Sequence, residues 1–148
     1  MTAPRYQDIE PEAIPAVALD GGVRVKVIAG EVGGRHGPVD GVATDPTYLD
    51  VTLPAGATFS HDLPPDYTAF AYVSNGAVRI GGKTVCRGAL AVLGPGNEID
   101  IGAEGSAARL IVVAGRPLHE PIAKYGPFVM NTEAELRQAV ADYRTGRF

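Results

Sequence analysis

Turn-forming residues recur along nearly the whole chain, and this spacing limits the fold more than any other feature. The 148 residues include 19 glycines and 12 prolines, which separate short apolar runs instead of collecting in one segment. Some of these runs alternate apolar and polar residues, as Val23–Ile28 does, which is typical of strands with one wet face. Many short strands between frequent turns indicate an all-β barrel or sandwich.

Two glycine-containing pairs predict sharp reversals of the chain. Asn75-Gly76 follows the aromatic-rich run Tyr67–Ser74, which is typical of a buried strand, and precedes Ala77–Ile80. Asn and Gly both tolerate positive φ, so this pair predicts a β-hairpin. Gly81-Gly82 then predicts a second tight turn before Lys83–Arg87.

A single helix is predicted at the end of the chain, over Glu133–Tyr143. Thr132 as N-cap and Glu135 three residues later have the form of a capping box. One apolar stripe follows the helical period and comprises Leu136, Ala139, Val140 and Tyr143. An apolar connector, Pro121–Thr132, leads into the helix. A connector and stripe of this kind need a large surface to cover.

Composition excludes several classes of protein. The net charge is −4 and the lysines and arginines are scattered, so direct binding of nucleic acid is not expected. No apolar run reaches membrane-spanning length, and the first residues contain no signal core. The single cysteine, Cys86, excludes an internal disulfide and fits the cytoplasm, where we expect this protein. We expect Cys86 to be a small buried apolar residue rather than a catalytic thiol, since no histidine lies near it in sequence.

Several stretches, in a constant order, carry a resemblance to a known family. They are Arg5–Ile9 with Ile14-Pro15, Gly22–Glu31, Thr47–Leu53, Ala91–Gly94, Ala114–Leu118, Glu120-Pro121 and Tyr125–Thr132. The last of these, with Gly-Pro-Phe-Val-Met-Asn-Thr at positions 126–132, is the most specific. The chain resembles the pirin family of the cupin superfamily, and in particular its C-terminal cupin domain.

The resemblance implies a jelly-roll cupin barrel or sandwich with two appendages. Residues 1–16 resemble the linker between the two pirin domains and form an extended arm. Residues 17–118 are expected to form the barrel, and residues 119–148 the apolar connector and helix. Pirins normally carry a further N-terminal cupin whose metal site opens with His-Pro-His, and no His-x-His segment occurs here. The chain therefore looks like a pirin without its first half.

The resemblance also indicates where a metal would bind, and the residues there do not match. His61 lies near a ligand position of the first cupin motif, but Leu63 stands where a second histidine is expected. The other two histidines, His36 and His119, fall in separate segments. We therefore predict no catalytic residue, no cofactor and no metal for this chain, with His61 as the one candidate ligand. Iron or another divalent metal is implied for two-domain relatives.

Two other surfaces are candidates for binding. Polar groups at a barrel mouth, Tyr48, His61, Asp62 and Tyr72, could surround a ligand. The alternative is that both tyrosines are core aromatics whose hydroxyls reach solvent or a backbone carbonyl. The second surface is an interaction surface of Phe128, Met130, Leu136, Val140 and Tyr143.

The family's C-terminal helix is expected to pack on the N-terminal domain, which this sequence does not contain. We therefore expect a homodimer in which arms or helices are exchanged, as in domain swapping. The alternatives are a helix folded on its own barrel, or a separate N-terminal pirin domain as partner. The expected function is that of a non-catalytic structural or binding half. The alternative is part of a split or truncated pirin with metal-dependent quercetin 2,3-dioxygenase activity, its metal lying in a separate cupin.

Overall fold

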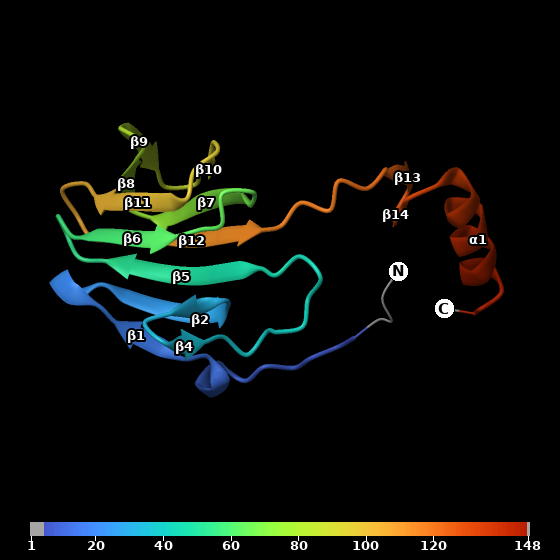
Figure 1. Ribbon diagram of the computed structural model, residues 1–148, viewed down its shortest axis with the longest axis horizontal. Coiled ribbons are helices and arrows are strands. Elements are labelled where there is room, and N and C mark those ends of the chain that lie inside the picture. The colour runs from blue at the N-terminus through green and yellow to red at the C-terminus, as the bar shows by residue number, and fades with distance from the viewer. Residues whose placement is uncertain (1–4, 148) are drawn as a thin grey trace. The chain divides into compact units, whose positions relative to one another are not determined.

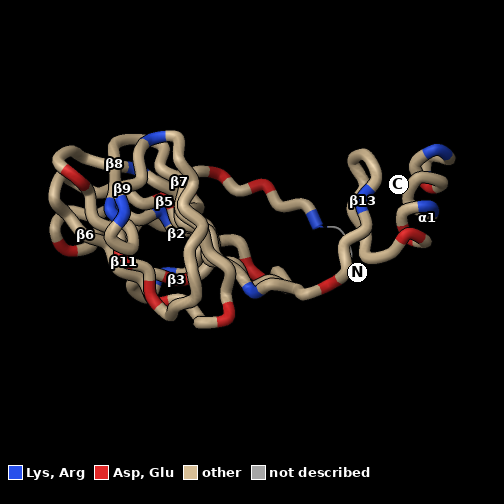
Figure 2. The backbone as a smooth tube through the Cα atoms, turned by 90° about the horizontal axis from the view of Figure 1, so that it is seen from above, with Lys and Arg blue, Asp and Glu red and all other residues tan. Residues whose placement is uncertain are grey.

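The computed structural model describes residues 5–147, which fold as two compact units. The first unit extends to Pro117 and the second begins at Leu118. Acidic and basic positions are interspersed along the first unit (Figure 2), as the scattered charges of the sequence indicated. None of the helices between residues 5 and 147 is long and apolar enough to cross a membrane.

The first unit is a sandwich of two antiparallel sheets (Figure 1). The six-stranded sheet has the order β1 (Ala16–Ala18), β2 (Arg24–Ala29), β5 (Thr47–Leu53), β12 (Ala108–Gly115), β7 (Thr68–Asn75) and β10 (Leu90–Val92). The four-stranded sheet has the order β6 (Thr58–Asp62), β11 (Glu98–Ala103), β8 (Ala77–Ile80) and β9 (Lys83–Cys86). A small hairpin, β3 (Glu31–Val32) with β4 (Arg35–His36), and 3-10 turns at Pro11–Ala13 and Asp20–Gly22 complete the unit.

Strand periodicity builds the core between the two sheets. In β5 every second side chain is inaccessible to solvent, with Leu49, Val51 and Leu53 all at 0% exposure. Residues from the other sheet, among them Phe59 and Ile101, complete the same apolar cluster. Because successive strand residues point to opposite faces, this alternation places one face of each sheet inside and the other outside. The predicted all-β sandwich is confirmed.

The structure confirms one of the two turns predicted at glycine pairs and contradicts the other. Ile80 pairs with Lys83 across Gly81-Gly82, whose φ angles of 54° and 75° form the predicted tight turn. The predicted hairpin at Asn75-Gly76 is wrong, since β7 belongs to the six-stranded sheet and β8 to the four-stranded sheet. The chain crosses between sheets at Gly76, where φ is 72° and a Cβ would lie 2.5 Å from the carbonyl oxygen of Ala107. Gly76 thus provides a positive φ at a corner between the two sheets, and not in a hairpin turn.

Two expectations about burial are also corrected. The run Tyr67–Ser74 is not buried on both faces: β7 buries Ala69, Ala71 and Val73, whereas Tyr72 remains 38% exposed. Cys86 is exposed, because it ends β9 at the edge of the four-stranded sheet. In both cases the strand has one face that the rest of the unit does not cover.

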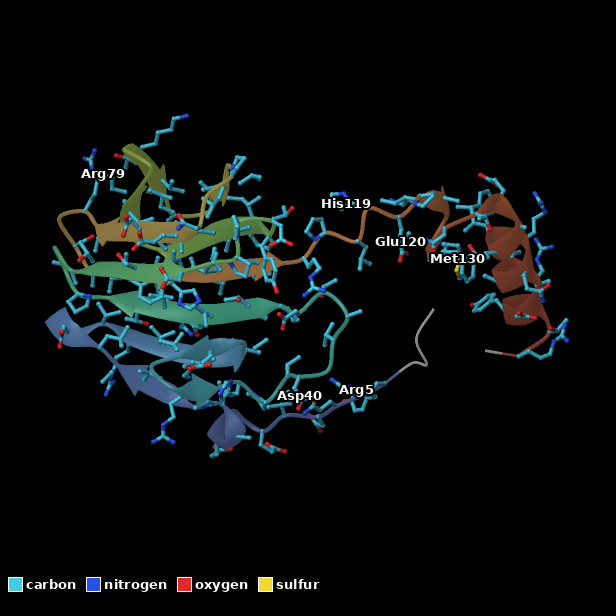
Figure 3. All side chains as sticks on the ribbon, in the orientation of Figure 1. Arg5, Asp40, Arg79, His119, Glu120 and Met130 are labelled. Carbon is cyan, nitrogen blue, oxygen red and sulfur yellow. The ribbon has the colours of Figure 1, made fainter. Side chains whose placement is uncertain are left out.

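The N-terminal arm is attached to the loop that precedes β5. The side chain of Arg5 lies beside Asp40, with 3.7 Å between guanidinium and carboxylate (Figure 3). Gln7 donates a hydrogen bond of 3.1 Å to the carbonyl oxygen of Pro38. The first four residues of the predicted arm lie outside the described residues, and the equivalence of the arm to an interdomain linker stays a prediction.

The second unit is a hairpin followed by a helix. Strands β13 (Ala123–Tyr125) and β14 (Phe128–Met130) pair through a two-residue turn, in which Gly126 has a φ of 56°. Helix α1 (Glu133–Arg144) begins with the predicted capping box. The backbone N–H of Glu135 donates to the Thr132 hydroxyl at 3.2 Å, and the backbone N–H of Thr132 donates to the Glu135 carboxylate at 2.8 Å. The predicted helix is therefore confirmed, with one further residue at its C-terminal end.

Candidate functional site

The four side chains proposed for a barrel-mouth site do not meet on one face. His61 follows the alternation of Phe59 and Leu63, which places it on the inner face of β6. Its neighbour Asp62 is exposed on the outer face of the same strand. Tyr48 and Tyr72, each 38% exposed, lie on the outer face of the six-stranded sheet, opposite to the core side chains of β5 and β7. Only His61 of the four therefore faces the space between the sheets.

His61 sits in a largely apolar setting. Its imidazole stacks on the ring of Phe59, with centroids 6.0 Å apart and an interplanar angle of 10°. Burial lowers the pKa of His61 below its ordinary value, and the nearby Asp62 carboxylate partly offsets this shift. The ring is therefore neutral at pH 7, the form in which histidine binds metals.

The residues near His61 offer a metal few further ligands. Leu63, two residues on along the same inner face, is 7% exposed and offers no ligand atom. Over residues 5–147, no three histidine, cysteine, aspartate or glutamate side chains are grouped so that they could hold a metal ion. His36 instead lies 3.5 Å from Glu31 on the exposed β3–β4 hairpin, and His119 belongs to the second unit. The donor set around His61 does not fit a cupin metal centre.

A polar cluster that the sequence did not indicate joins three chain segments near the start of β5. The Tyr67 hydroxyl donates a 2.6 Å hydrogen bond to the carboxylate of Asp45, a residue with a φ of 45°. This hydrogen bond raises the pKa of Tyr67, and Arg116 acts in the opposite direction. The backbone N–H of Arg116 in turn donates to the carbonyl oxygen of Thr44 at 2.8 Å. Asp-Pro at 45–46 was the one local signal of this turn; the partners come together only through the fold.

The predicted interaction surface is brought together within the second unit. Leu136 on α1 is 3% exposed and Ala139 is 6% exposed, and the helix packs on β13 and β14. Phe128 and Tyr143 meet edge to face with centroids 5.8 Å apart. Met130 is half-buried on the hairpin, and its side chain lies on the side facing α1 (Figure 3). The helix stripe is thus partly covered by the connector that precedes it.

This packing leaves a groove between β13 and α1. The groove has a volume of about 460 Å³. Its lining is Lys124, Tyr125, Glu133, Leu136, Arg137, Val140, Ala141 and Arg144. Tyr125 and Tyr143 remain 69% and 67% exposed, and Ile122 at the start of the hairpin segment is 79% exposed. The second unit therefore combines a small buried core with several exposed apolar side chains.

Comparison with known proteins agrees with the resemblance seen in the sequence. Residues 48–148 match the Pirin C-terminal cupin domain. A pirin-like protein of Caulobacter vibrioides is 44% identical over 149 residues, which cover 100% of this chain and 54% of that protein. Human pirin is 37% identical over 152 residues, which cover 99% of this chain and 52% of pirin. The chain spans about half the length of the curated relatives it matches.

A solved structure agrees in fold as well. The crystal structure of quercetin 2,3-dioxygenase from Acinetobacter baumannii superposes with a TM-score of 0.90 at 35% identity. The superposition covers 100% of this chain and 52% of that one. The expected cupin fold with one C-terminal helix is confirmed. This chain belongs to the pirin family, and it corresponds to the family's C-terminal cupin domain.

Proposed function

We propose that this chain acts as a non-catalytic structural and binding half of pirin type, and that it associates with a second copy of itself. The observation that carries the proposal is the second unit, where an open groove lies beside exposed apolar side chains. In a chain acting alone, such side chains remain in water at a cost of roughly 25 cal/mol per Å². Association through the connector and helix would remove them from water.

The inner face of β6 supports the non-catalytic part of the proposal. An oxygen-activating metal needs several imidazole or carboxylate ligands that converge on one point. Here His61 is flanked on that face by Phe59 and Leu63, which are apolar and buried. We therefore assign the inner face to the core and the binding role to outer surfaces.

Sedimentation equilibrium of the purified chain at micromolar concentrations tests the self-association. We expect twice the mass of one chain, and a shift toward the monomer in Tyr143→Asp, which places a charge on the exposed end of the α1 stripe. The matched control Ala134→Asp introduces the same side chain at an exposed position of α1 that belongs neither to the stripe nor to the groove lining. A compact wild-type monomer at all these concentrations would contradict the proposal.

A second function is favoured by the likeness to the Acinetobacter enzyme, of which this chain covers 52%. In this alternative, the chain is part of a split or truncated pirin with quercetin 2,3-dioxygenase activity, and the metal lies in a separate N-terminal cupin. Metal analysis of the natively purified protein separates the two. Stoichiometric iron found only in a complex with a second polypeptide, together with oxygen consumption on quercetin, would favour the alternative. Iron bound by the chain alone would contradict both assignments.

A further inference from the structure

Two rows of apolar side chains lie on the outer face of the six-stranded sheet and together extend over four of its strands. The register pairs Leu90 of β10 with Tyr72 of β7, and Tyr72 with Ile111 of β12. A second row runs beside the first and joins Val92, Phe70, Val113 and Tyr48. Both rows lie opposite to the core side chains of the same strands, such as Ala71 and Val112. We call these two rows the sheet patch.

The other sheet of the same unit provides an internal comparison. Its outer face places Ser60 opposite Asp100 and Asp62 opposite Glu98, and the hydroxyl of Ser60 donates to the Asp100 carboxylate. Farther along this face, Arg79 forms an ion pair with Glu104. An outer face that meets only water is expected to be polar in an antiparallel sheet. The four-stranded sheet follows this rule, and the sheet patch departs from it.

The sheet patch is large enough to act as the centre of an interface. Tyr48 and Tyr72 are each 38% exposed, Leu90 is 54% exposed and Val92 is 71% exposed. Since a whole aromatic side chain offers about 150–250 Å², these four residues alone expose on the order of 400 Å². A patch of this size lies in the range where exposed apolar surface marks an interaction site. A standard interface buries about 800 Å² per partner, of which roughly 60%, or about 480 Å², is apolar, so these four residues supply most of the apolar area that such an interface needs.

Charged residues border the sheet patch near β2 and the start of β12. A groove of about 490 Å³ there is lined by Arg24, Lys26, Asp50 and Arg109 among others. Asp50, which follows Ile111 in the first row, accepts two hydrogen bonds from the Arg109 guanidinium, at 2.9 and 2.6 Å. The carboxylate nearest the patch is thus already paired. A two-fold axis parallel to the strands would place β10 of one copy over β5 of the other.

We propose that the sheet patch is the interface through which two copies of this chain pack face to face. The inference rests on the proposed self-association and adds a second surface to it: the outer face of the six-stranded sheet, besides the connector and helix. Such an interface is isologous, since the same patch serves both copies. Packing two sheets face to face is a common way to bury apolar strand faces.

Sedimentation equilibrium of charge-substituted variants tests this interface. Val92→Asp and Leu90→Asp each place a carboxylate in the patch, and we expect each to raise the dimer dissociation constant at least about tenfold. The matched control Thr58→Asp places the same carboxylate on the exposed outer face of β6, and we expect it to leave the constant unchanged. Far-UV circular dichroism identifies any variant that has lost its fold. Because Val92 is 71% exposed, its substitution removes little of the monomer's packing.

The outcomes separate this inference from the function on which it rests. A dimer weakened by both patch variants and unaffected by Thr58→Asp supports the sheet interface. If both patch variants remain dimeric but Tyr143→Asp dissociates, the sheet interface is refuted and the proposed function stands. A wild-type monomer overturns both.

Discussion

The second unit contains a small core of its own, and Leu136→Ala tests whether that core holds α1 in place. Leu136 is 3% exposed and lies on the helix face that packs on β13 and β14. Substitution of a buried leucine by alanine costs between about 2 and 5 kcal/mol, depending on how well the surroundings relax. Leu136 also borders the open groove of about 460 Å³, so water can reach part of the space left behind. We therefore expect a cost near the lower limit, about 2 kcal/mol.

Hydrogen exchange of the α1 backbone amides measures this cost locally. It is preferable to a global melt because a chain of two units need not unfold in one step. A loss of about 2 kcal/mol corresponds to exchange about 30-fold faster, since 1.4 kcal/mol is tenfold. Arg137→Ala is the matched control: it removes an exposed side chain from the next position and keeps a good helix former. Equal exchange in the two variants would refute the argument that the hairpin holds the helix.

Three further predictions concern the pH dependence, the helix cap and the corner between the sheets. Because burial lowers the folded-state pKa of His61 below 6.5, its contribution to stability is present above pH 6.5 and is lost as the pH falls below that value. Urea unfolding between pH 5 and 8 should therefore become less pH-dependent in His61→Gln, and an unchanged profile in that variant would contradict this. Thr132→Ala should speed exchange in the first turn of α1, equivalent to about 1 kcal/mol, and no effect there would contradict the capping role. Gly76→Ala should lower the free energy of unfolding by more than Gly81→Ala, since both residues have positive φ but only at Gly76 would the added Cβ meet a carbonyl oxygen at 2.5 Å; equal losses would contradict this.

Features of this chain that depend on residues close together in sequence agree with their sequence-based prediction. The capping box joins Thr132 and Glu135, three residues apart, and both its hydrogen bonds form as predicted. The alternation along Val23–Ile28 likewise predicts a strand with one wet face, and β2 buries Val25 and Val27 while Arg24 and Lys26 are exposed. Both patterns are decided within a few residues of the chain, where sequence and geometry are directly linked.

The candidate sites depended on longer-range contacts and were predicted less well. For Tyr48 and Tyr72 the sequence allows either a barrel mouth or the core, and in the structure both lie on the outer face of the six-stranded sheet, opposite to the core side chains. Cys86 was expected inside and is exposed at a sheet edge. The residue type determines which interactions a side chain can make, but the strand register and the neighbouring strands determine on which face the side chain lies and whether it is covered.

The all-β class, the position and cap of the helix, and the pirin-type order of the segments can be predicted from the amino-acid sequence alone. These follow from residue periodicity and from motifs that occupy short stretches of chain. Which strands are neighbours depends on the folded chain: Gly76 is a corner between sheets, although Asn-Gly has the composition of a hairpin. It also aligned Leu90, Tyr72 and Ile111 from three strands in one row. Residues separated by up to 39 positions become an apolar surface only after the strands are paired, because pairing and not proximity in sequence determines what a sheet presents to a partner.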